Sequence, residues 1–360
     1  MKLLFVISSL SAGGAERVLT TLANHFSQSC EVVIVTISDE PPFYPLSDEV
    51  RLIQLGLMRE SKHIFDTTGN TLRRIRELVE VLRNEDPDVV ISFMTQTNFL
   101  AVIASKISGY KIIISERITF DYWKSPKLNG LRRLIYPFSD ALVTQTYGDK
   151  DNYKYLKNIH VIYNPLSNGF SKNVFKKEKL VLGAGRLDKQ KGFDKLIRAF
   201  HGTGRSDWKL VIAGEGNERE NLEKLIENLG ASNIELIGRT KAIFDWYARA
   251  SIFVLSSSRE GFPNVLLEAM SMDCAVVSFD CPYGPGEIIE DGINGILVEN
   301  QNEEKLREAL ERLIEAPELR NKLGEEAKKV REKYSIEKIS GEWEQLIRRV
   351  AESESHGGER

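Results

Sequence analysis

The sequence has few cysteines and almost no excess charge. Its 360 residues include three cysteines, Cys30, Cys274 and Cys281. Three thiols are too few for a disulfide scaffold or a zinc cluster, and they suit a reducing cytosol. The formal charge of −3 provides no overall attraction to nucleic acid, so we expect no nucleic-acid partner.

Long apolar runs are also missing. The apolar run at residues 3–7 is shorter than the roughly 7–15 residues of a secretory signal core, so it predicts a first strand. The longest uncharged run, residues 89–105, contains Ser92, Thr95 and Asn98 and makes a poor membrane span. We therefore expect any membrane contact to be peripheral.

Apolar segments alternate with amphipathic helical patterns along most of the chain. A length of 360 residues predicts about two domains. Uniformly apolar strands separated by helices predict parallel sheets that are covered on both faces. Strands are expected at residues 3–7, 32–37, 89–93, 111–115, 141–144, 160–162, 180–183, 209–213, 234–237, 252–256, 275–279 and 295–298.

A polar, lysine-rich stretch that follows Asn164 and Pro165 is typical of a linker. We therefore predict an α/β protein with two doubly wound Rossmann-like domains that face a cleft, residues 1–165 and 166–335. Residues 303–350 form a nearly continuous amphipathic helical pattern. We expect residues 336–352 to form a helix that crosses back to the first domain, and residues 353–360 to be a disordered tail.

The first candidate site is the pair Gly13 and Gly14, between the first strand and the first helix. Glycines let backbone N–H groups approach an anion, and a helix N-terminus attracts negative charge. A tight turn explains the same residues. The segment is not GxGxxG, which argues against a dinucleotide dehydrogenase.

The second candidate is the loop at residues 185–192, after the first strand of the second domain. Arg186 and Lys191 place two cations where a diphosphate could bind. A solvated basic loop is the alternative interpretation.

The third candidate is the most specific. Glu260 precedes a predicted helix and Glu268 lies inside it, eight residues later. Two carboxylates at this spacing can accept hydrogen bonds from two hydroxyl groups, and a charged Glu268 among apolar neighbours is costly unless it is paired. The alternative is an ordinary surface glutamate. The helix begins with residues whose amides would lie at its N-terminus: Phe262, Pro263, Asn264 and Val265.

Taken together and in this order, Gly13-Gly14, Gly185-Arg186 with Lys191, and the Glu260–Glu268 pair resemble the GT-B glycosyltransferases of family 4. The resemblance spans almost the whole chain. It implies a retaining, metal-independent enzyme that uses a nucleotide-sugar donor and no cofactor. Segments 281–289 and 291–295 resemble bacterial members that elongate lipid-linked or surface oligosaccharides.

The resemblance also implies roles for single residues. Gly13 and Gly14 would contact the donor near its phosphate, while Arg186 and Lys191 would neutralise the diphosphate as it leaves. Glu260 would orient the donor sugar together with the amides near residues 264 and 265. Glu268 would hold the ribose, and Gly238 with Arg239 would meet the base.

One departure from the family pattern concerns histidine. Many relatives place a histidine near the sugar, where this chain has Ser115, Glu116 and Arg117. Glu116 or Arg117 could contribute instead, and no catalytic base is assigned. Asp86 and Asp88 match a D-x-D metal pattern, but they precede a predicted strand and are typical of a strand-entry turn.

The net charge hides a local excess of cations. Residues 101–157 contain ten basic and five acidic residues, interleaved with large apolar side chains. This composition suits docking on anionic lipid, although a solvated basic face is the alternative. The candidates for acceptor or membrane contact are Arg117, Lys124, Lys127, Arg132 and Arg133.

The leading hypothesis is a cytoplasmic enzyme that associates peripherally with the inner face of the cell membrane. It would transfer a hexose or N-acetylhexosamine from a UDP-sugar to a growing glycan, carried on a polyprenyl diphosphate. The alternatives are a GT-B-shaped UDP-sugar epimerase and a non-catalytic sugar-nucleotide-binding protein.

Overall fold

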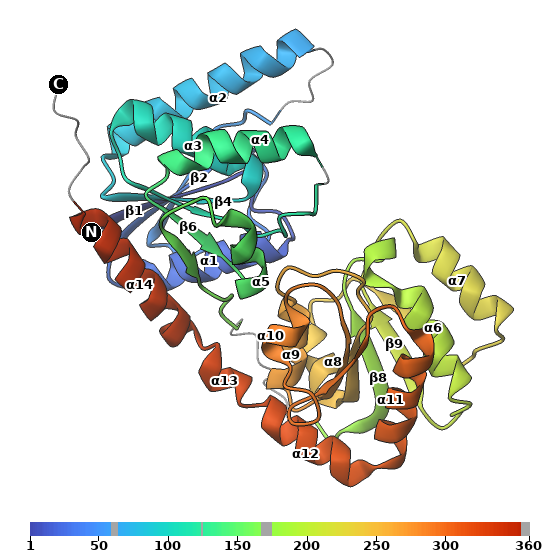
Figure 1. Cartoon of the computed structure of the whole chain (residues 1–360). Helices are drawn as coiled ribbons and strands as arrows, with labels where there is room; N and C mark the ends of the chain where they lie inside the picture. The colour runs from blue at the N-terminus through green and yellow to red at the C-terminus, as the bar shows by residue number, and fades with distance from the viewer. Residues whose placement is uncertain (59–63, 124, 167–174, 354–360) are drawn as a thin grey trace. The chain divides into compact units, whose positions relative to one another are not determined.

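The computed structural model describes residues 1–58, 64–123, 125–166 and 175–353, except for the side chains of residues 64–68. The chain divides into two compact units (Figure 1). The first unit comprises Met1–Pro165 and Ile336–Arg360, and the second comprises Leu166–Ser335. The part of the tail beyond residue 353 lies outside the described residues.

The first unit contains a seven-stranded parallel sheet with the strand order β3-β2-β1-β4-β5-β6-β7. Its strands are apolar at nearly every position, as expected for a sheet buried on both faces. The strands are β1 (Lys2–Ile7), β2 (Glu31–Thr36), β3 (Val50–Gln54), β4 (Val89–Phe93), β5 (Ile112–Ser115), β6 (Ala141–Thr144) and β7 (Ile159–Val161).

Helices cover both faces of this sheet (Figure 1). One face packs against α1 (Gly14–Phe26) and α14 (Ile336–Glu352), and the other against α2 (Ile64–Glu85) and α3 (Thr95–Ser108). Alternate residues of β1 belong to the two cores, as the two-residue period of a strand requires. The unit also contains α4 (Pro126–Ile135), η1 (Tyr136–Phe138), α5 (Tyr147–Lys150) and η2 (Asp151–Tyr153).

The last helix therefore packs on the first unit, as predicted. Its buried residues recur at helical spacing along one stripe, which includes Ile339, Trp343 and Leu346. The indole of Trp343 stacks on Phe93 of β4 with ring centroids 6.1 Å apart. This stripe completes the core on the α1 face of the sheet.

The second unit contains a six-stranded parallel sheet with the strand order β10-β9-β8-β11-β12-β13. Two β-α-β-type halves meet between β8 and β11, as in doubly wound folds. The strands are β8 (Glu178–Ala184), β9 (Lys209–Ala213), β10 (Ile234–Gly238), β11 (Ala250–Leu255), β12 (Ala275–Asp280) and β13 (Ile296–Glu299).

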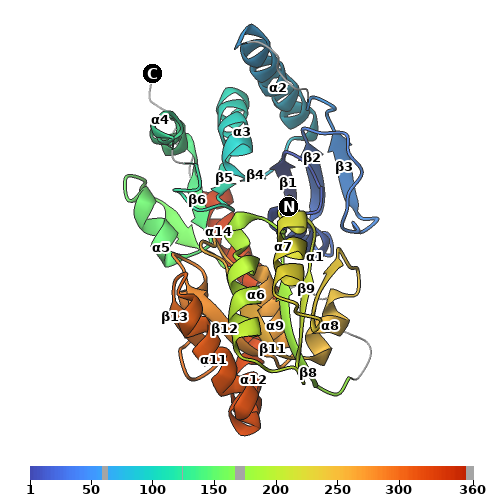
Figure 2. The ribbon, with the colours of Figure 1, turned by 90° about the vertical axis from the view of Figure 1, so that its right-hand side faces the viewer.

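On one face of this sheet, α6 (Phe193–Gly202) and α11 (Glu303–Glu315) lie side by side (Figure 2). Helices α8 (Ile243–Arg249) and α9 (Asn264–Ser271) pack against each other and against β11. The remaining elements are η3 (Lys189–Lys191), α7 (Arg219–Asn228), α10 (Pro285–Ile288), α12 (Pro317–Ala327) and α13 (Val330–Lys333).

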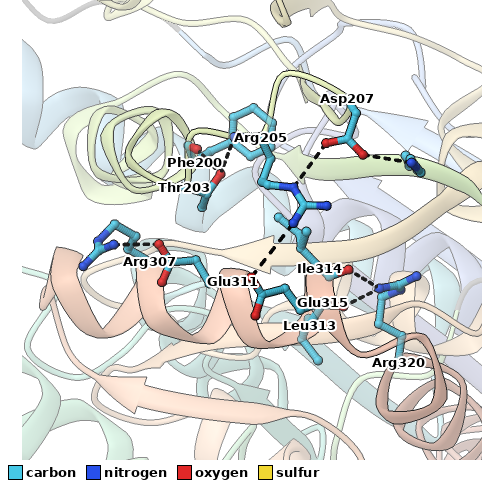
Figure 3. A network of polar contacts seen from close by, with 11 residues as sticks. Phe200, Thr203, Arg205, Asp207, Arg307, Glu311, Leu313, Ile314, Glu315 and Arg320 are labelled. Atoms are coloured by element: carbon cyan, nitrogen blue, oxygen red, sulfur yellow. Dashed lines mark hydrogen bonds and ion pairs between the residues drawn. The ribbon is translucent and has the colours of Figure 1, made fainter.

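A polar network at the surface of the second unit ties β8 to the loop before β9 (Figure 3). Hydrogen bonds from Lys179 and then Arg205 lower the pKa of Asp207 to about 2. On α11, Arg307 Nη1 donates to Glu311 Oε1 at 2.6 Å. These are solvent-exposed pairs, which contribute little stability individually.

The two-domain α/β prediction is confirmed, with two differences in detail. Strand β3 was not predicted, because it lies at the sheet edge and carries Arg51 and Gln54 among its five residues. The helical pattern at residues 303–350 is divided among α11, α12, α13 and α14. Pro317 begins α12, where its fixed φ fits a first helical turn but cannot continue the preceding helix.

Candidate functional site

The loop after β8 is shaped by a side-chain cap and two glycines. The Asp188 carboxylate accepts a hydrogen bond from the Lys191 backbone N–H at 3.1 Å and caps η3. Gly192 has a φ of +61°, and a Cβ there would lie 2.3 Å from the Ser256 carbonyl oxygen. Only glycine fits this position, which brings the end of η3 against the end of β11.

This loop brings Lys191 to Glu260, a residue 69 positions later in the chain. Lys191 Nζ donates to Glu260 Oε1 at 2.6 Å, and the two side chains are only 17% and 9% exposed. Gly185 lies against the lysine stem, since a Cβ there would be 3.3 Å from Lys191 Cε. Two of the predicted site residues are therefore in direct contact.

Cys281, which follows β12, belongs to the same neighbourhood. Burial and, next, the negative charge of Glu260 raise the pKa of the Cys281 thiol to about 12, and the charge of Lys191 opposes this shift. The thiol therefore stays protonated at neutral pH. The loops after β8, β11 and β12 consequently meet at one place on the carboxyl edge of the sheet.

Arg186 lies in the same loop but at its surface. Its Nε donates to Asp188 Oδ2 at 2.6 Å, and the side chain is 64% exposed. The same carboxyl group thus caps η3 and holds the guanidinium. An exposed arginine beside the buried Lys191–Glu260 pair presents a planar fork of donors to solvent, where an anionic ligand could reach it.

The second carboxylate, Glu268, lies in α9 and is 2% exposed. Its Oε2 accepts a hydrogen bond from the Tyr247 hydroxyl of α8 at 3.1 Å. The interpretation of Glu268 as a surface glutamate is therefore wrong. Tyr247 is fully buried and was not predicted, because its contact depends on how α8 and α9 pack.

The segment between the two carboxylates is tightly packed. The Gly284 N–H donates to the Gly261 carbonyl at 3.1 Å, and a Cβ on Gly284 would lie 2.5 Å from Pro263 Cδ. Pro263 is the N-cap of α9, so the amides of Asn264 and Val265 belong to its first turn. Phe262 is buried, with its ring centroid 5.8 Å from that of Tyr334.

Glycines also allow the ends of β8, β9 and β10 to lie in close contact. The Gly214 N–H donates to the Gly238 carbonyl at 2.8 Å, and a Cβ on Gly214 would lie 1.8 Å from the Gly185 carbonyl oxygen. Gly238 has a φ of +75°, and Arg239 after it is exposed. Gly238 and Arg239 therefore lie on the same carboxyl edge as the Lys191 loop.

In the first unit, Gly13 is the N-cap of α1 and Gly14 its first residue. A Cβ on Gly13 would lie 2.0 Å from Glu16 Oε2, so the Glu16 side chain occupies the space that the missing side chain leaves. Burial raises the pKa of Glu16. Binding of an anion at the α1 N-terminus would therefore require the Glu16 carboxylate to move away or to take up a proton.

Glu116 and Arg132 form a buried ion pair in the first unit. Their side chains are 0% exposed, and Arg132 Nε lies 3.7 Å from Glu116 Oε1. Glu116 also accepts hydrogen bonds from the hydroxyls of Thr95, at 2.7 Å, and Tyr136. Burial raises the pKa of Glu116 even though Arg132 lowers it. The prediction of Arg132 as a membrane-facing cation is wrong, because its side chain is fully buried against Glu116.

Arg117 is buried as well, at 7% exposed. Its Nη1 donates to Asn164 Oδ1 at 2.7 Å, and its guanidinium lies 4.5 Å from the ring centroid of Phe93 and 5.6 Å from that of Trp343. Burial lowers the pKa of Arg117 to about 9. Its predicted place on a membrane-facing surface is therefore wrong too, since it packs between β4 and α14.

The other predicted membrane residues differ in their placement. Lys127 and Arg133 are exposed on α4, as are the apolar side chains of Leu131, at 43%, and Leu134, at 66%. Lys124 lies outside the described residues. No helix within the described part of the chain is both long and apolar enough to cross a membrane.

The D-x-D segment has structural partners. Asp86 Oδ1 accepts from the Tyr110 hydroxyl at 3.0 Å, and Asp88 Oδ2 accepts from the Lys2 backbone N–H at 2.7 Å. This agrees with a strand-entry turn. Over the residues that the structure describes, no group of three or more His, Cys, Asp or Glu side chains is placed to hold a metal ion.

Comparison with known proteins covers both units. Residues 12–167 match the family model described as Glycosyltransferase Family 4, and residues 167–330 match the model for Glycosyl transferases group 1. The chain is 34% identical to the GalNAc-alpha-(1->4)-GalNAc-alpha-(1->3)-diNAcBac-PP-undecaprenol alpha-1,4-N-acetyl-D-galactosaminyltransferase of Campylobacter jejuni, over 97% of this chain and 99% of that protein.

A second Campylobacter jejuni protein is also similar. It is the N-acetylgalactosamine-N,N'-diacetylbacillosaminyl-diphospho-undecaprenol 4-alpha-N-acetylgalactosaminyltransferase, 30% identical over 91% of this chain and 94% of that protein. Among solved structures, HepE of Anabaena in complex with UDP superposes with a TM-score of 0.79 and 17% identity, covering 97% of this chain and 100% of that one. The similarity to HepE shows the fold alone.

Proposed function

The chain belongs to the family 4 glycosyltransferases of GT-B fold, and from this premise we propose that it is a retaining, metal-independent enzyme that uses a UDP-sugar. It transfers a hexose or N-acetylhexosamine to a growing glycan on a polyprenyl diphosphate. The observation that carries the proposal is the contact between Lys191 and Glu260 at the carboxyl edge of the second sheet, together with the buried Glu268 eight residues later in α9. A cation and two carboxylates can bind a diphosphate and the hydroxyls on either side of it.

In the proposed reaction, the bond between the sugar C1 and the donor phosphate oxygen breaks. A bond to the acceptor hydroxyl forms on the same face of the sugar, and the departing phosphate takes the acceptor's proton. Negative charge therefore develops on the diphosphate, where Arg186 and Lys191 stabilise it. No side chain of the protein needs to act as the base.

The donor would be bound along the carboxyl edge of the second sheet. Glu260 would accept hydrogen bonds from the sugar hydroxyls while Lys191 bridges it to the diphosphate. Glu268, fixed by Tyr247, would accept from the ribose hydroxyls. The N-terminal amides of α9 and the main chain of Gly238 would complete the contacts to the sugar and the base.

The two Campylobacter jejuni relatives, whose names specify undecaprenyl-linked substrates, support a lipid-linked acceptor. A lipid substrate requires access to the membrane. The exposed cations Lys127 and Arg133, together with Leu131 and Leu134 on α4, suit a peripheral contact with anionic lipid at the cytoplasmic face.

The test is sugar transfer from UDP-sugars to synthetic polyprenyl-diphosphate glycans, followed by mass spectrometry. Lys191→Ala and Glu260→Ala should each lower kcat by roughly 100-fold or more, by analogy with removing one preorganised contact to developing charge. Arg186→Ala should weaken donor turnover as well. Lys189→Ala, an exposed lysine in the same loop, is the matched control and should remain active.

Full activity in the Arg186, Lys191 and Glu260 variants would refute the proposal. Two further measurements address its finer parts. The NMR coupling of the product's anomeric proton must show the donor's configuration, and activity must survive a chelator. Incubation of the UDP-sugar without an acceptor should yield no epimerised product.

A further inference from the structure

The first unit holds a cavity of about 660 Å³ at the amino-terminal edge of its sheet. Lys111, Asp140 and Asn158 line it, and each comes directly before or within two residues of the start of β5, β6 or β7. The ends of α3 and α14, together with residues 136–139 and 155–157, contribute most of the remaining lining. Gly13 and Gly14 follow the carboxyl end of β1, so the cavity lies at the opposite edge of the sheet from these residues.

The lining of this cavity carries a surplus of positive charge. Its cations are Lys106, Lys111, Lys157 and Arg349, whereas Asp140 is the sole carboxylate among its described lining residues. Asp140 lies 3.8 Å from the Lys106 ammonium and 3.7 Å from that of Lys111. One carboxylate oxygen also accepts the Ile112 backbone N–H at 2.8 Å. A single carboxylate therefore pairs with two lysines and accepts a hydrogen bond from the first residue of β5.

The other two cations have no carboxylate partner within the described part of the chain. Lys157 is exposed, and Arg349 Nε donates to the Gln345 carbonyl at 3.2 Å, within its own helix. Burial and, next, the charges of Arg349 and Lys150 lower the pKa of His160, which also lines the cavity. The local electrostatic potential is thus positive, and the cavity favours an anion.

Exposed apolar side chains occur in the cavity lining and in the neighbouring sequence. Phe138 lines the cavity and is 57% exposed, while Ile107, next to Lys106, is 56% exposed. Leu134, one turn before Phe138, is 66% exposed. Cations interleaved with exposed aromatic and aliphatic groups are typical of surfaces that enter the headgroup region of a membrane.

We propose that this cavity binds the phosphate headgroup of an anionic phospholipid, with Lys157 and Arg349 as its principal ligands. Its volume is in the range that accommodates a small ligand. Phe138, Ile107 and Leu134 would contact the acyl region. The inference rests on the membrane association proposed above and adds a specific lipid site, separate from the donor edge of the second unit and from the cations of α4.

The test uses the full chain and short-chain phosphatidylglycerol below its micelle concentration, with binding measured by calorimetry. Lys157→Gln/Arg349→Gln should weaken binding by about 30-fold, since each cation near a phosphate contributes roughly fivefold in affinity. The matched control Lys224→Gln/Lys322→Gln removes two exposed lysines of the second unit and should bind as wild type. Phosphatidylcholine of the same chain length and inorganic phosphate are the comparison ligands.

Three results together support the site. Phosphatidylglycerol binds saturably, both comparison ligands bind more weakly, and the cavity variant loses the binding. No saturable binding, equal affinity for inorganic phosphate, or equal loss in the control variant overturns it. Sugar transfer to a soluble acceptor analogue is measured in parallel. Transfer without lipid binding contradicts only the lipid site, and lipid binding without transfer contradicts only the proposed enzyme activity.

Discussion

The buried pair of Arg132 and Glu116 makes a quantitative prediction for the variant Arg132→Met. Both side chains are 0% exposed, and Arg132 also donates to the Phe120 carbonyl at 2.8 Å and to Thr95 Oγ1 at 3.2 Å. Methionine keeps an unbranched apolar stem but is shorter than arginine, and it leaves the Glu116 carboxylate buried without its cation. Breaking one side of such a pair costs about 3–5 kcal/mol, so we expect the free energy of unfolding of the first unit to fall by that amount.

The assay must report on one unit, because a two-unit chain need not unfold in a single step. Hydrogen exchange measured by mass spectrometry in urea, on peptides that cover β4, β5 and β6, isolates the first unit. The double variant Glu116→Gln/Arg132→Met removes both charges and should recover part of the loss. A cost below about 1 kcal/mol, or strictly additive single and double effects, would refute the assignment of Arg132 to the core.

Three further predictions concern single side chains. Burial raises the pKa of Asp149 from 3.8 to about 7, so between these values the folded state keeps a proton that the unfolded state has lost; stability should fall by about 4 kcal/mol as pH rises from about 4 to 7, and Asp149→Asn should flatten this decline in thermal denaturation curves. Tyr247→Phe removes the hydroxyl that binds Glu268 and should raise KM for the UDP-sugar several-fold, with wild-type unfolding as the control measurement. Trp343→Ala should cost about 3–5 kcal/mol and expose α14 to limited proteolysis, because the indole is fully buried and stacks on Phe93; undiminished protease resistance would contradict this.

The parallel sheets could be predicted because each central strand is apolar on both faces. Strand β3 could not, since Arg51 and Gln54 interrupt the apolar pattern in a strand of only five residues. Its Arg51 forms an ion pair with Glu85 at the end of α2, a contact between residues 34 positions apart. A local pattern of alternating polarity does not reveal such a partner.

For the candidate site, the basic loop and the spacing of the two glutamates select Lys191 and Glu260, which the structure brings into contact, and Glu268, which it buries in α9. The Lys191–Glu260 contact follows from the topology, because the carboxyl ends of the neighbouring strands β8 and β11 are adjacent. Tyr247 could not be selected in this way. Its role depends on the packing of α8 on α9, and its sequence neighbourhood is typical of a core helix.

Two of the five cations predicted to contact the acceptor or the membrane, Arg117 and Arg132, are buried, and the reason is physical. Counting charges along residues 101–157 treats every cation as solvated, yet Arg117 and Arg132 are buried against aromatic rings and a carboxylate. Lys127 and Arg133, in contrast, are exposed. Because charge composition gives no information on burial, only the structure separates the two pairs.

The packing of α14 on the first unit has a consequence for biosynthesis. Residues 336–352 supply Ile339, Trp343 and Leu346 to a core whose strands are all translated before residue 162. A nascent chain on the ribosome therefore cannot complete the core of the first unit until residues 336–352 have been translated. The second unit lies in sequence between the two parts of the first, so truncation of the chain before residue 336 should destabilise the first unit, although all strands of that unit would still be translated.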